Sequence, residues 1–298
     1  MSDQLPSATF ILGAARSGTS LLYKAICLHP ESAYFNNWMR RMPGRPELSL
    51  ANWVARNTPR MRNRVWFGTD SNAYVYARSR SLPERLYPMP VEGEPIFARC
   101  GIDERGGAPT PGQVGALRRA VRGAVRWGGG THFVNKRVAN NRRVALLAEA
   151  FPAARFIDLT RDGRAVALSL SRVDWWEGST VWWYGGTPGA WRDGGGDPWE
   201  LCARNWVEEV RAIDGGLGAI DGERVLHLRY EEFVAEPRET VRQIAGFMGL
   251  DEDSTWLDAV GALSLADRNR TWQSRLSPDQ VAVIEGVQAQ DLVRLGYR

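Results

Sequence analysis

The sequence predicts an α/β fold in which a parallel β-sheet is flanked by helices on both faces. Short apolar runs with the length of buried strands are each followed by a turn and then by a segment with helical periodicity. This strand, turn and helix order occurs around Gly13 and again around Asp162. Because strands joined through helices usually pair in parallel, the alternation indicates one sheet covered on both sides.

The predicted strands and helices follow one another along the chain in a regular order. An apolar run with the length of a buried strand covers residues 8–12 and ends at Gly13. Further strands are expected at residues 132–135, 155–160 and 225–228. Helices are expected at residues 17–28, 142–150, 165–171, 198–213 and 237–249, and from 277 to about 296. The glycine-rich stretch at residues 185–196 is expected to be a mobile loop.

The length and composition of the chain favour a single domain, 1–298. With 44% hydrophobic and 24% charged residues, the chain resembles an ordinary globular protein with a sizeable core. Residues 8–35 and 130–298 carry the strand and helix pattern and are expected to form a ligand-binding core. Residues 36–129 are polar, only weakly periodic and rich in Pro, Gly, Arg and Trp. We expect them to form an irregular, helical insertion or cap on the substrate side.

The charge of the chain limits its partners. Lys and Arg number 38 against 34 Asp and Glu, a net charge of +4, and the only lysines are Lys24 and Lys136. Arginine suits the planar recognition of phosphate or sulfate, although a GC-rich genome gives the same bias without any function. No basic stripe is dense enough to indicate nucleic-acid binding.

The cysteines and the terminal segments indicate a compartment. Cys27, Cys100 and Cys202 stand far apart, without the spacing of a metal site, so we expect a reducing environment and no metal. The amino terminus lacks the pattern of a secretory signal, and no segment has the character of a membrane span. A cytoplasmic location is therefore expected. The oligomeric state is left open.

A glycine-rich loop follows the first predicted strand. Residues 13–20 have the spacing of a P-loop, in which backbone N–H groups and a helix N-terminus form a concave anion site. A nucleoside triphosphatase needs lysine after the second glycine, where this chain has Thr19. No acidic residue ends an apolar strand in the manner of a magnesium site. The loop indicates an anionic ligand held without magnesium, and a tight turn with no catalytic role is the alternative.

Several separated motifs resemble those of the sulfotransferase family. The loop reads Arg-Ser-Gly-Thr-Ser at residues 16–20, and a strand leads into Arg-Asp-x-Arg-Ala-Val-x-x-Ser at residues 161–169. The segments at 227–233 and 269–278 are similar to further family segments. The resemblance covers residues 8–40 and 130–298 and is closest in style to bacterial and tyrosylprotein sulfotransferases. It implies a P-loop nucleotide-kinase-like sulfotransferase fold.

The resemblance also implies a sulfate donor, 3′-phosphoadenosine 5′-phosphosulfate (PAPS), with adenosine 3′,5′-bisphosphate as product. The loop is expected to hold the 5′-phosphosulfate end through Arg16, Ser17, Gly18, Thr19 and Ser20. Arg161 is expected to hold the 3′-phosphate by a charged fork, and Ser169 by its hydroxyl. Further donor contacts are expected from Tyr230, Arg270 and Trp272.

Lys136 is the candidate for stabilising the charge that develops on the leaving phosphate. It lies at the end of the predicted strand at residues 132–135, in a Phe-Val-Asn-Lys sequence similar to the Asn-Lys of tyrosylprotein sulfotransferases. A lysine at a strand end is more commonly just solvated, which is the alternative here. Arg16 is expected to share this catalytic role.

The general base is not fixed by any motif. Tyrosylprotein sulfotransferases place a glutamate after a His-Pro pair, and this chain has Asn36 and Asn37 there, neither of which accepts a proton at neutral pH. The remaining candidates are His132, Glu31, Asp70 and Asp174. His132 ranks first because it titrates near neutrality. A histidine at a strand start is at least as commonly a hydrogen-bonding structural residue. The alternative is an acceptor that is a phenol or another acidic hydroxyl and needs little help in losing its proton, in which case Asn36 is expected to orient it by hydrogen bonding.

A cluster of tryptophans lies downstream of the 161–169 motif, at Trp175, Trp176, Trp182 and Trp183. Flanking glycines allow these rings to form a lid over a flat or lipophilic acceptor. The alternative is that two or three of them pack in the core. Both interpretations are expected to hold for different members of the set.

The function predicted from these features is sulfuryl transfer from PAPS to a hydroxyl of a small molecule, such as a natural product, carbohydrate or lipid. One alternative is a P-loop kinase using ATP, which Thr19 opposes. The other is a catalytically impaired nucleotide-binding protein, for which Asn36 is the best support. Neither alternative is excluded by the sequence.

Overall fold

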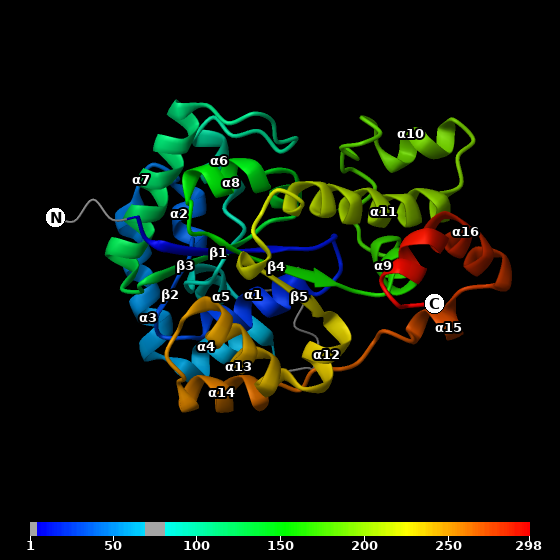
Figure 1. The fold of residues 1–298 in the computed structure, drawn as a ribbon. Helices are drawn as coiled ribbons and strands as arrows, with labels where there is room; N and C mark the ends of the chain where they lie inside the picture. Colours follow the sequence, from blue (N-terminus) through cyan, green and yellow to red (C-terminus); the bar gives the residue numbers. More distant parts are fainter. Residues whose placement is uncertain (1–4, 69–80) are drawn as a thin grey trace.

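The computed structural model describes residues 5–68 and 81–298. Within them a five-stranded sheet has the order β2-β3-β1-β4-β5, with every neighbouring pair parallel. The strands are β1 (Ser7–Leu12), β2 (Ser32–Ala33), β3 (His132–Lys136), β4 (Arg155–Thr160) and β5 (Val225–Arg229). Figure 1 shows this sheet at the centre, with helices on both sides. The predicted α/β fold with a helix-flanked parallel sheet is confirmed.

The helices connect and cover the strands. The amino-terminal half contains α1 (Thr19–Cys27), α2 (Asn37–Arg41), η1 (Pro46–Ala51), α3 (Asn52–Asn57), α4 (Pro59–Phe67), α5 (Leu82–Leu86), α6 (Glu94–Arg99), α7 (Pro111–Gly128), η2 (Val138–Arg142) and α8 (Val144–Ala150). The carboxyl-terminal half contains α9 (Gly163–Leu170), α10 (Pro188–Asp193), α11 (Pro198–Leu217), η3 (Gly222–Arg224), α12 (Tyr230–Ala235), α13 (Pro237–Met248), α14 (Ser254–Gly261), α15 (Thr271–Arg275) and α16 (Pro278–Arg294).

Two apolar layers hold the sheet between the helices. Successive strand residues point to opposite faces, so Phe10 and Ile11 enter different cores. Ile11 packs in the layer formed with α1, α13 and α14, and Phe10 in the layer formed with α7, α8 and α11. Figure 1 shows these two groups of helices on opposite sides of the sheet.

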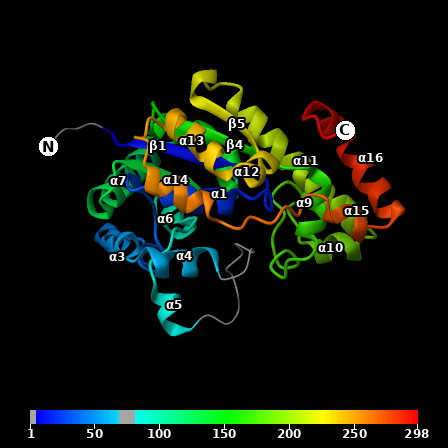
Figure 2. The ribbon, with the colours of Figure 1, turned by 90° about the horizontal axis from the view of Figure 1, so that it is seen from below.

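The segment 36–129 is mostly helical in its described part, as expected. Its longest helix, α7, begins with a capping box between Thr110 and Gln113 and ends at Gly129 in the left-handed conformation. Figure 1 shows α2, α3 and α7 at the end of the molecule away from α10 and α16, and Figure 2 shows α3 and α7 there as well.

Several elements differ from the prediction. The stretch at 185–196 was expected to be a loop, but Thr187 caps the short helix α10 within it. The predicted helix at 142–150 begins only at Val144, after η2. β2, α12 and α14 were not predicted, because they are short or lack a clear period. No helix in the described part of the chain combines the length and the apolar character needed to cross a membrane.

Candidate functional site

The carboxyl ends of four strands meet at one edge of the sheet. β1 leads into the loop at Gly13, β3 ends at Lys136, β4 is followed by Arg161, and β5 by Tyr230. The parallel registers place Ile11 opposite Lys136 and Thr160 opposite Arg229, so these chain segments end side by side. Ligands of open parallel sheets bind at this edge.

The loop at residues 13–20 has a strained backbone. Gly13 and Gly18 have φ angles of 147° and 89°. Arg16 also has a positive φ, 75°, which among the described residues no other non-glycine residue has. A Cβ on Gly18 would overlap the ring of Tyr230. Glycine is therefore needed at position 18 both for its backbone and for the tyrosine that packs against it.

Replacing Gly18 by Ala is expected to lower the free energy of unfolding by about 1–3 kcal/mol, because the new methyl group must displace Tyr230 in a strained backbone. Thermal unfolding measures the change. Gly246→Ala is the matched control, since this α13 glycine has open space around it and alanine favours a helix. Equal effects of the two substitutions would contradict the role of the contact.

The loop contains a buried polar atom that lacks a partner. The Ser17 side chain is 1% exposed, and its hydroxyl makes no hydrogen bond within the protein. It lies just before α1, whose N-cap residue Gly18 supplies no side-chain cap. An anion at the N-terminus of α1 would satisfy this hydroxyl together with the backbone N–H groups of the first turn. The loop residues therefore fit a phosphate or sulfate group.

A pocket of about 280 Å³ opens beside the loop. It is lined by Arg16, Gly18, Leu21, Arg161, Ala165, Leu168, Ser169, Arg172, Val173, Tyr230, Leu265, Ala266, Arg268 and Thr271. Four of these residues are arginines, which makes the pocket strongly cationic. Such a lining suits a ligand with more than one anionic group.

Hydrogen bonds join the polar residues of this pocket to each other. Arg16 Nε donates to Ser169 Oγ at 3.0 Å. Arg161 is 8% exposed, donates to Asn269 Oδ1 and to the carbonyl of Arg16, and lies 4.2 Å from the ring centre of Tyr230. The structure thus brings together four of the residues predicted for donor binding.

Two other predicted donor contacts lie outside the pocket lining. Arg270 is exposed at the start of α15, and the Trp272 ring stacks on the guanidinium of Arg164 at 4.3 Å. Their neighbours Arg268 and Thr271 line the pocket in their place. The sequence motif located the segment, but it could not determine which of its side chains turn inward.

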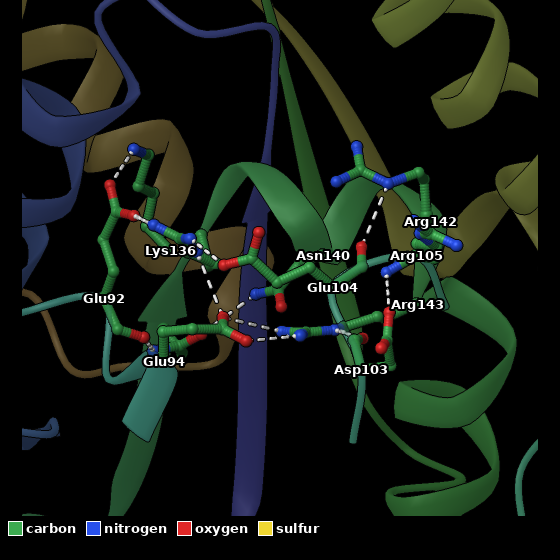
Figure 3. Close-up of polar contacts among 11 residues, drawn as sticks. Glu92, Glu94, Asp103, Glu104, Arg105, Lys136, Asn140, Arg142 and Arg143 are labelled. Atoms are coloured by element: carbon green, nitrogen blue, oxygen red, sulfur yellow. Dashed lines mark hydrogen bonds and ion pairs between the residues drawn. The ribbon is translucent and has the colours of Figure 1, made fainter. Parts of the chain in front are cut away.

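Lys136 forms a second centre on the other side of the loop. Its side chain is 5% exposed, and Nζ donates to Ser20 Oγ at 3.2 Å and to Glu92 Oε1 at 2.5 Å. The other oxygen of Glu92 accepts from Arg137 at 2.6 Å. Figure 3 shows Lys136 and Glu92 pointing toward one another. A carboxylate and an ammonium group therefore lie together beside the loop.

Glu92 is ionised in this environment. Burial tends to raise the pKa of its carboxyl, but the charges of Lys136 and Arg137 outweigh burial and lower that pKa below its usual value. No local motif identifies this residue, because it lies in the weakly periodic insertion, 44 positions before its lysine partner. The isolated bridge between Asn36 and Pro90 positions its segment.

Further ion pairs fasten this segment to β3 and η2. Glu94 accepts from Arg137 and Arg143, and Arg143 is fully buried with its Nη2 2.7 Å from Glu94 Oε1. Arg137 also pairs with the exposed Glu104. Figure 3 shows the network running from Lys136 to Arg142. The network holds the loop that carries Glu92 against the strand that carries Lys136.

The structure places His132, the residue predicted as general base, away from the loop. His132 is the first residue of β3, at the opposite edge of the sheet from the loop, and its Nε2 lies 2.8 Å from Thr9 Oγ1. Burial and the charge of Arg155 lower its pKa to about 4. Since β3 rises about 3.3 Å per residue, His132 lies more than ten ångströms from the loop along the strand and serves as a buried core side chain.

The other predicted residues for the acceptor side have structural roles or lie elsewhere. Asn36 is fully buried, caps α2 and donates to Asn52 Oδ1, so its side chain has no capacity left for an acceptor. Glu31 bonds Thr131 at the same edge as His132. Asp174 is exposed in the turn after α9, and Asp70 lies outside the described residues.

The tryptophan cluster is anchored mainly to α11. Trp176 is buried against this helix, Trp182 Nε1 donates to Glu209 at 2.9 Å, and Trp183 Nε1 donates to Asn205 at 3.3 Å. Trp175 is 51% exposed. None of the four lines the 280 Å³ pocket.

A buried glutamate connects this cluster to the loop. Glu209 accepts from Trp182 and from Asn141, and Asn141 in turn holds both the N–H and the carbonyl of Gly13. Burial outweighs the charge of Arg142 and raises the pKa of Glu209. Sequence reasoning did not identify this connection, because its members lie on η2 and α11. Within residues 5–68 and 81–298, no group of three or more His, Cys, Asp or Glu side chains is placed to hold a metal.

Comparisons with known proteins identify the family and the fold. A model of the sulfotransferase family matches residues 8–254. The omega-hydroxy-beta-dihydromenaquinone-9 sulfotransferase Stf3 of Mycobacterium bovis is 26% identical over 164 residues, which cover 54% of this chain and 40% of that protein. The same protein from Mycobacterium tuberculosis matches equally. The alignment thus spans less than half the length of these relatives.

Two solved structures share the fold. Sulfotransferase STF9 from Mycobacterium avium is 17% identical with a TM-score of 0.59, covering 98% of this chain and 77% of that one. Sulfotransferase STF1 from Mycobacterium tuberculosis H37Rv is 13% identical with a TM-score of 0.56, covering 95% and 77%. At such identities the likeness concerns the fold alone.

Proposed function

Because the chain belongs to the sulfotransferase family, we propose that it transfers a sulfuryl group from PAPS to a hydroxyl of a small-molecule acceptor. The observation that carries the proposal is the cationic pocket beside the loop, in which Arg16, Arg161 and Ser169 meet. A donor with anionic groups at the 3′ and 5′ positions of its ribose matches this arrangement, because the N-terminus of α1 and the cationic pocket provide two anion sites.

The residues around the two anion sites would hold the donor in distinct ways. The hydroxyl of Ser17 and the first N–H groups of α1 would bind its 5′ end. Arg161 and Ser169 would bind the 3′-phosphate, one by a charged fork and the other by its hydroxyl. When bound, PAPS supplies an electrophilic sulfur attached to a phosphate leaving group.

Lys136 is the residue positioned to stabilise the leaving phosphate. Its Nζ already contacts Ser20 of the loop, so the ammonium group lies where the 5′ end would be held. In this largely buried position a fixed positive charge stabilises developing negative charge more strongly than in water. Arg16 is proposed to share this role.

Glu92 is proposed as the general base that removes the proton of the acceptor hydroxyl. It is ionised, it contacts Lys136, and 23% of its side chain is exposed. As Lys136 engages phosphate, Glu92 loses one of the two cations that lower its pKa and becomes a better proton acceptor. Glu92 thereby replaces His132 as the proposed base.

Calorimetry tests the proposed donor. Adenosine 3′,5′-bisphosphate is expected to bind without metal, whereas ATP with magnesium is expected to bind at least tenfold more weakly, because the loop lacks the lysine of ATP-binding loops. A preference for magnesium ATP would refute the proposal in favour of a kinase. Turnover of PAPS with a panel of alcohols and phenols then tests the reaction. Tight bisphosphate binding without any turnover would indicate an impaired nucleotide-binding protein.

A further inference from the structure

The insertion exposes apolar side chains on the outward face of a helical segment. In η1 and α3, Leu50, Trp53 and Val54 are spaced as i, i+3 and i+4, which places them on one face. They are 54%, 66% and 41% exposed, while Asn52 and Ala55 on the opposite face are fully buried. This pattern inverts that of an ordinary surface helix, whose apolar stripe faces the core.

The same segment concentrates the positive charge of the protein. Residues 36–68 contain seven arginines and one glutamate, a net charge of +6, although the whole chain carries only +4. The rest of the chain is therefore net negative. Five of these arginines are exposed: Arg40, Arg41, Arg45, Arg60 and Arg64.

The helices that carry these residues lie together at one end of the molecule. Contacts join α2 to η1, η1 to α3, and α3 to α4. Figure 1 shows α2, α3 and α4 grouped at the end away from α15 and α16, and Figure 2 shows α3 and α4 there as well. Exposed Met42, just after α2, extends the apolar set. We name this surface the α2–α4 face: Arg40, Arg41, Met42, Arg45, Leu50, Trp53, Val54, Arg60 and Arg64.

We propose that the α2–α4 face docks the protein on an anionic lipid surface. Helices that lie in the membrane interface combine a tryptophan and aliphatic residues with surrounding basic residues. Arginine is suited to this place, because its stem lies along apolar surface while its charge reaches the lipid head groups. The net charge of +6 in this segment is the complement that such a surface requires.

The face is also continuous with the segment that carries Glu92. The α2 side chains Trp38 and Arg41 donate to the carbonyls of Leu86 and Arg85, and the chain runs from there to Glu92. Leu82 and Leu86 in α5 add exposed apolar side chains to this side. Docking would therefore bring the membrane to the insertion rather than to the nucleotide pocket, which leaves the pocket open to the solution.

Vesicle sedimentation tests the proposal without any reaction. The full chain is expected to bind vesicles of phosphatidylcholine with phosphatidylglycerol, to bind pure phosphatidylcholine vesicles poorly, and to dissociate at high ionic strength. The double variant Leu50→Ser with Trp53→Ser is expected to bind anionic vesicles at least about tenfold more weakly than the unmodified protein. Arg45→Gln with Arg60→Gln is expected to lose about twentyfold at low ionic strength.

Matched variants at the far end of the molecule provide the control. Val293→Ser and Arg275→Gln change an exposed apolar and an exposed basic residue there, and are expected to bind vesicles like the unmodified protein. Circular dichroism verifies that each variant is folded. The proposal is overturned if the unmodified protein ignores anionic vesicles, or if variants of the face bind as well as the controls. It is also overturned if Trp53→Ser leaves vesicle binding unchanged but lowers the molecular mass of the protein in solution, because the face would then join subunits of an oligomer.

Discussion

Replacing Arg161 by Ala is expected to weaken the binding of adenosine 3′,5′-bisphosphate by at least about a hundredfold. The guanidinium is 8% exposed, and a hydrogen bond between charged partners in such a site is worth roughly 1.5–3 kcal/mol. The substitution removes two such bonds if the fork engages phosphate, and isothermal calorimetry measures the loss. Arg161→Lys keeps the charge without the fork and is expected to bind with intermediate affinity.

A second ligand separates phosphate recognition from a general disturbance of the pocket. Arg161 also donates to the carbonyl of Arg16 and stacks on Tyr230, so its removal disturbs the loop to some extent. Adenosine 5′-monophosphate lacks the 3′-phosphate and should report that disturbance alone. The assignment predicts a large loss for the bisphosphate and a small one for the monophosphate. Equal losses would show that Arg161 only supports the loop.

The residues of the proposed donor half could be located from the sequence because they follow strand ends. Once Gly13 and Arg161 are placed after two parallel strands, the fold itself brings them to one edge of the sheet. Arg16, Ser169 and Tyr230 then meet at hydrogen-bond or packing distance. Local motifs therefore determined this half of the site, without knowledge of the helices that surround it.

The proposed acceptor half could not be located from the sequence, for the converse reason. Glu92 lies in a segment without strand or helix periodicity, and it reaches Lys136 through tertiary contacts that no sequence spacing reports. His132 was chosen for its chemistry, yet its place at the start of β3 puts it at the wrong edge. Asn36 occupies a family position for the base but is needed as a helix cap. Chemical type alone selected candidates that the topology keeps apart.

Replacing Glu92 by Gln is expected to lower kcat by roughly a hundredfold to ten-thousandfold, the usual contribution of a general base. The amide keeps the shape of the side chain and accepts a hydrogen bond, but it does not take a proton. Affinity for adenosine 3′,5′-bisphosphate should change little, because Arg161 and Ser169 line the 280 Å³ pocket and Glu92 does not. Steady-state kinetics with calorimetry on the same variant give both quantities.

Glu104→Gln is the matched control for this substitution. Glu104 pairs with the same Arg137 but is exposed and does not contact Lys136, so its loss should leave kcat within a few-fold. If Glu92 only positions Lys136, then Glu92→Gln and Glu92→Asp would impair turnover alike. A base predicts partial activity for the aspartate, which retains a carboxylate.

The pH dependence provides an independent criterion for the same residue. Lys136 and Arg137 lower the pKa of Glu92 in the free protein, so the carboxylate persists at neutral pH and kcat/KM should fall only as the pH drops below the usual range for glutamate. If Lys136 engages the donor phosphate in the complex, the pKa of Glu92 is expected to rise. The acid limb of kcat is therefore expected at higher pH than that of kcat/KM, and its disappearance in Glu92→Gln would identify the titrating group. Coincident limbs that persist in the variant would assign proton removal to another residue.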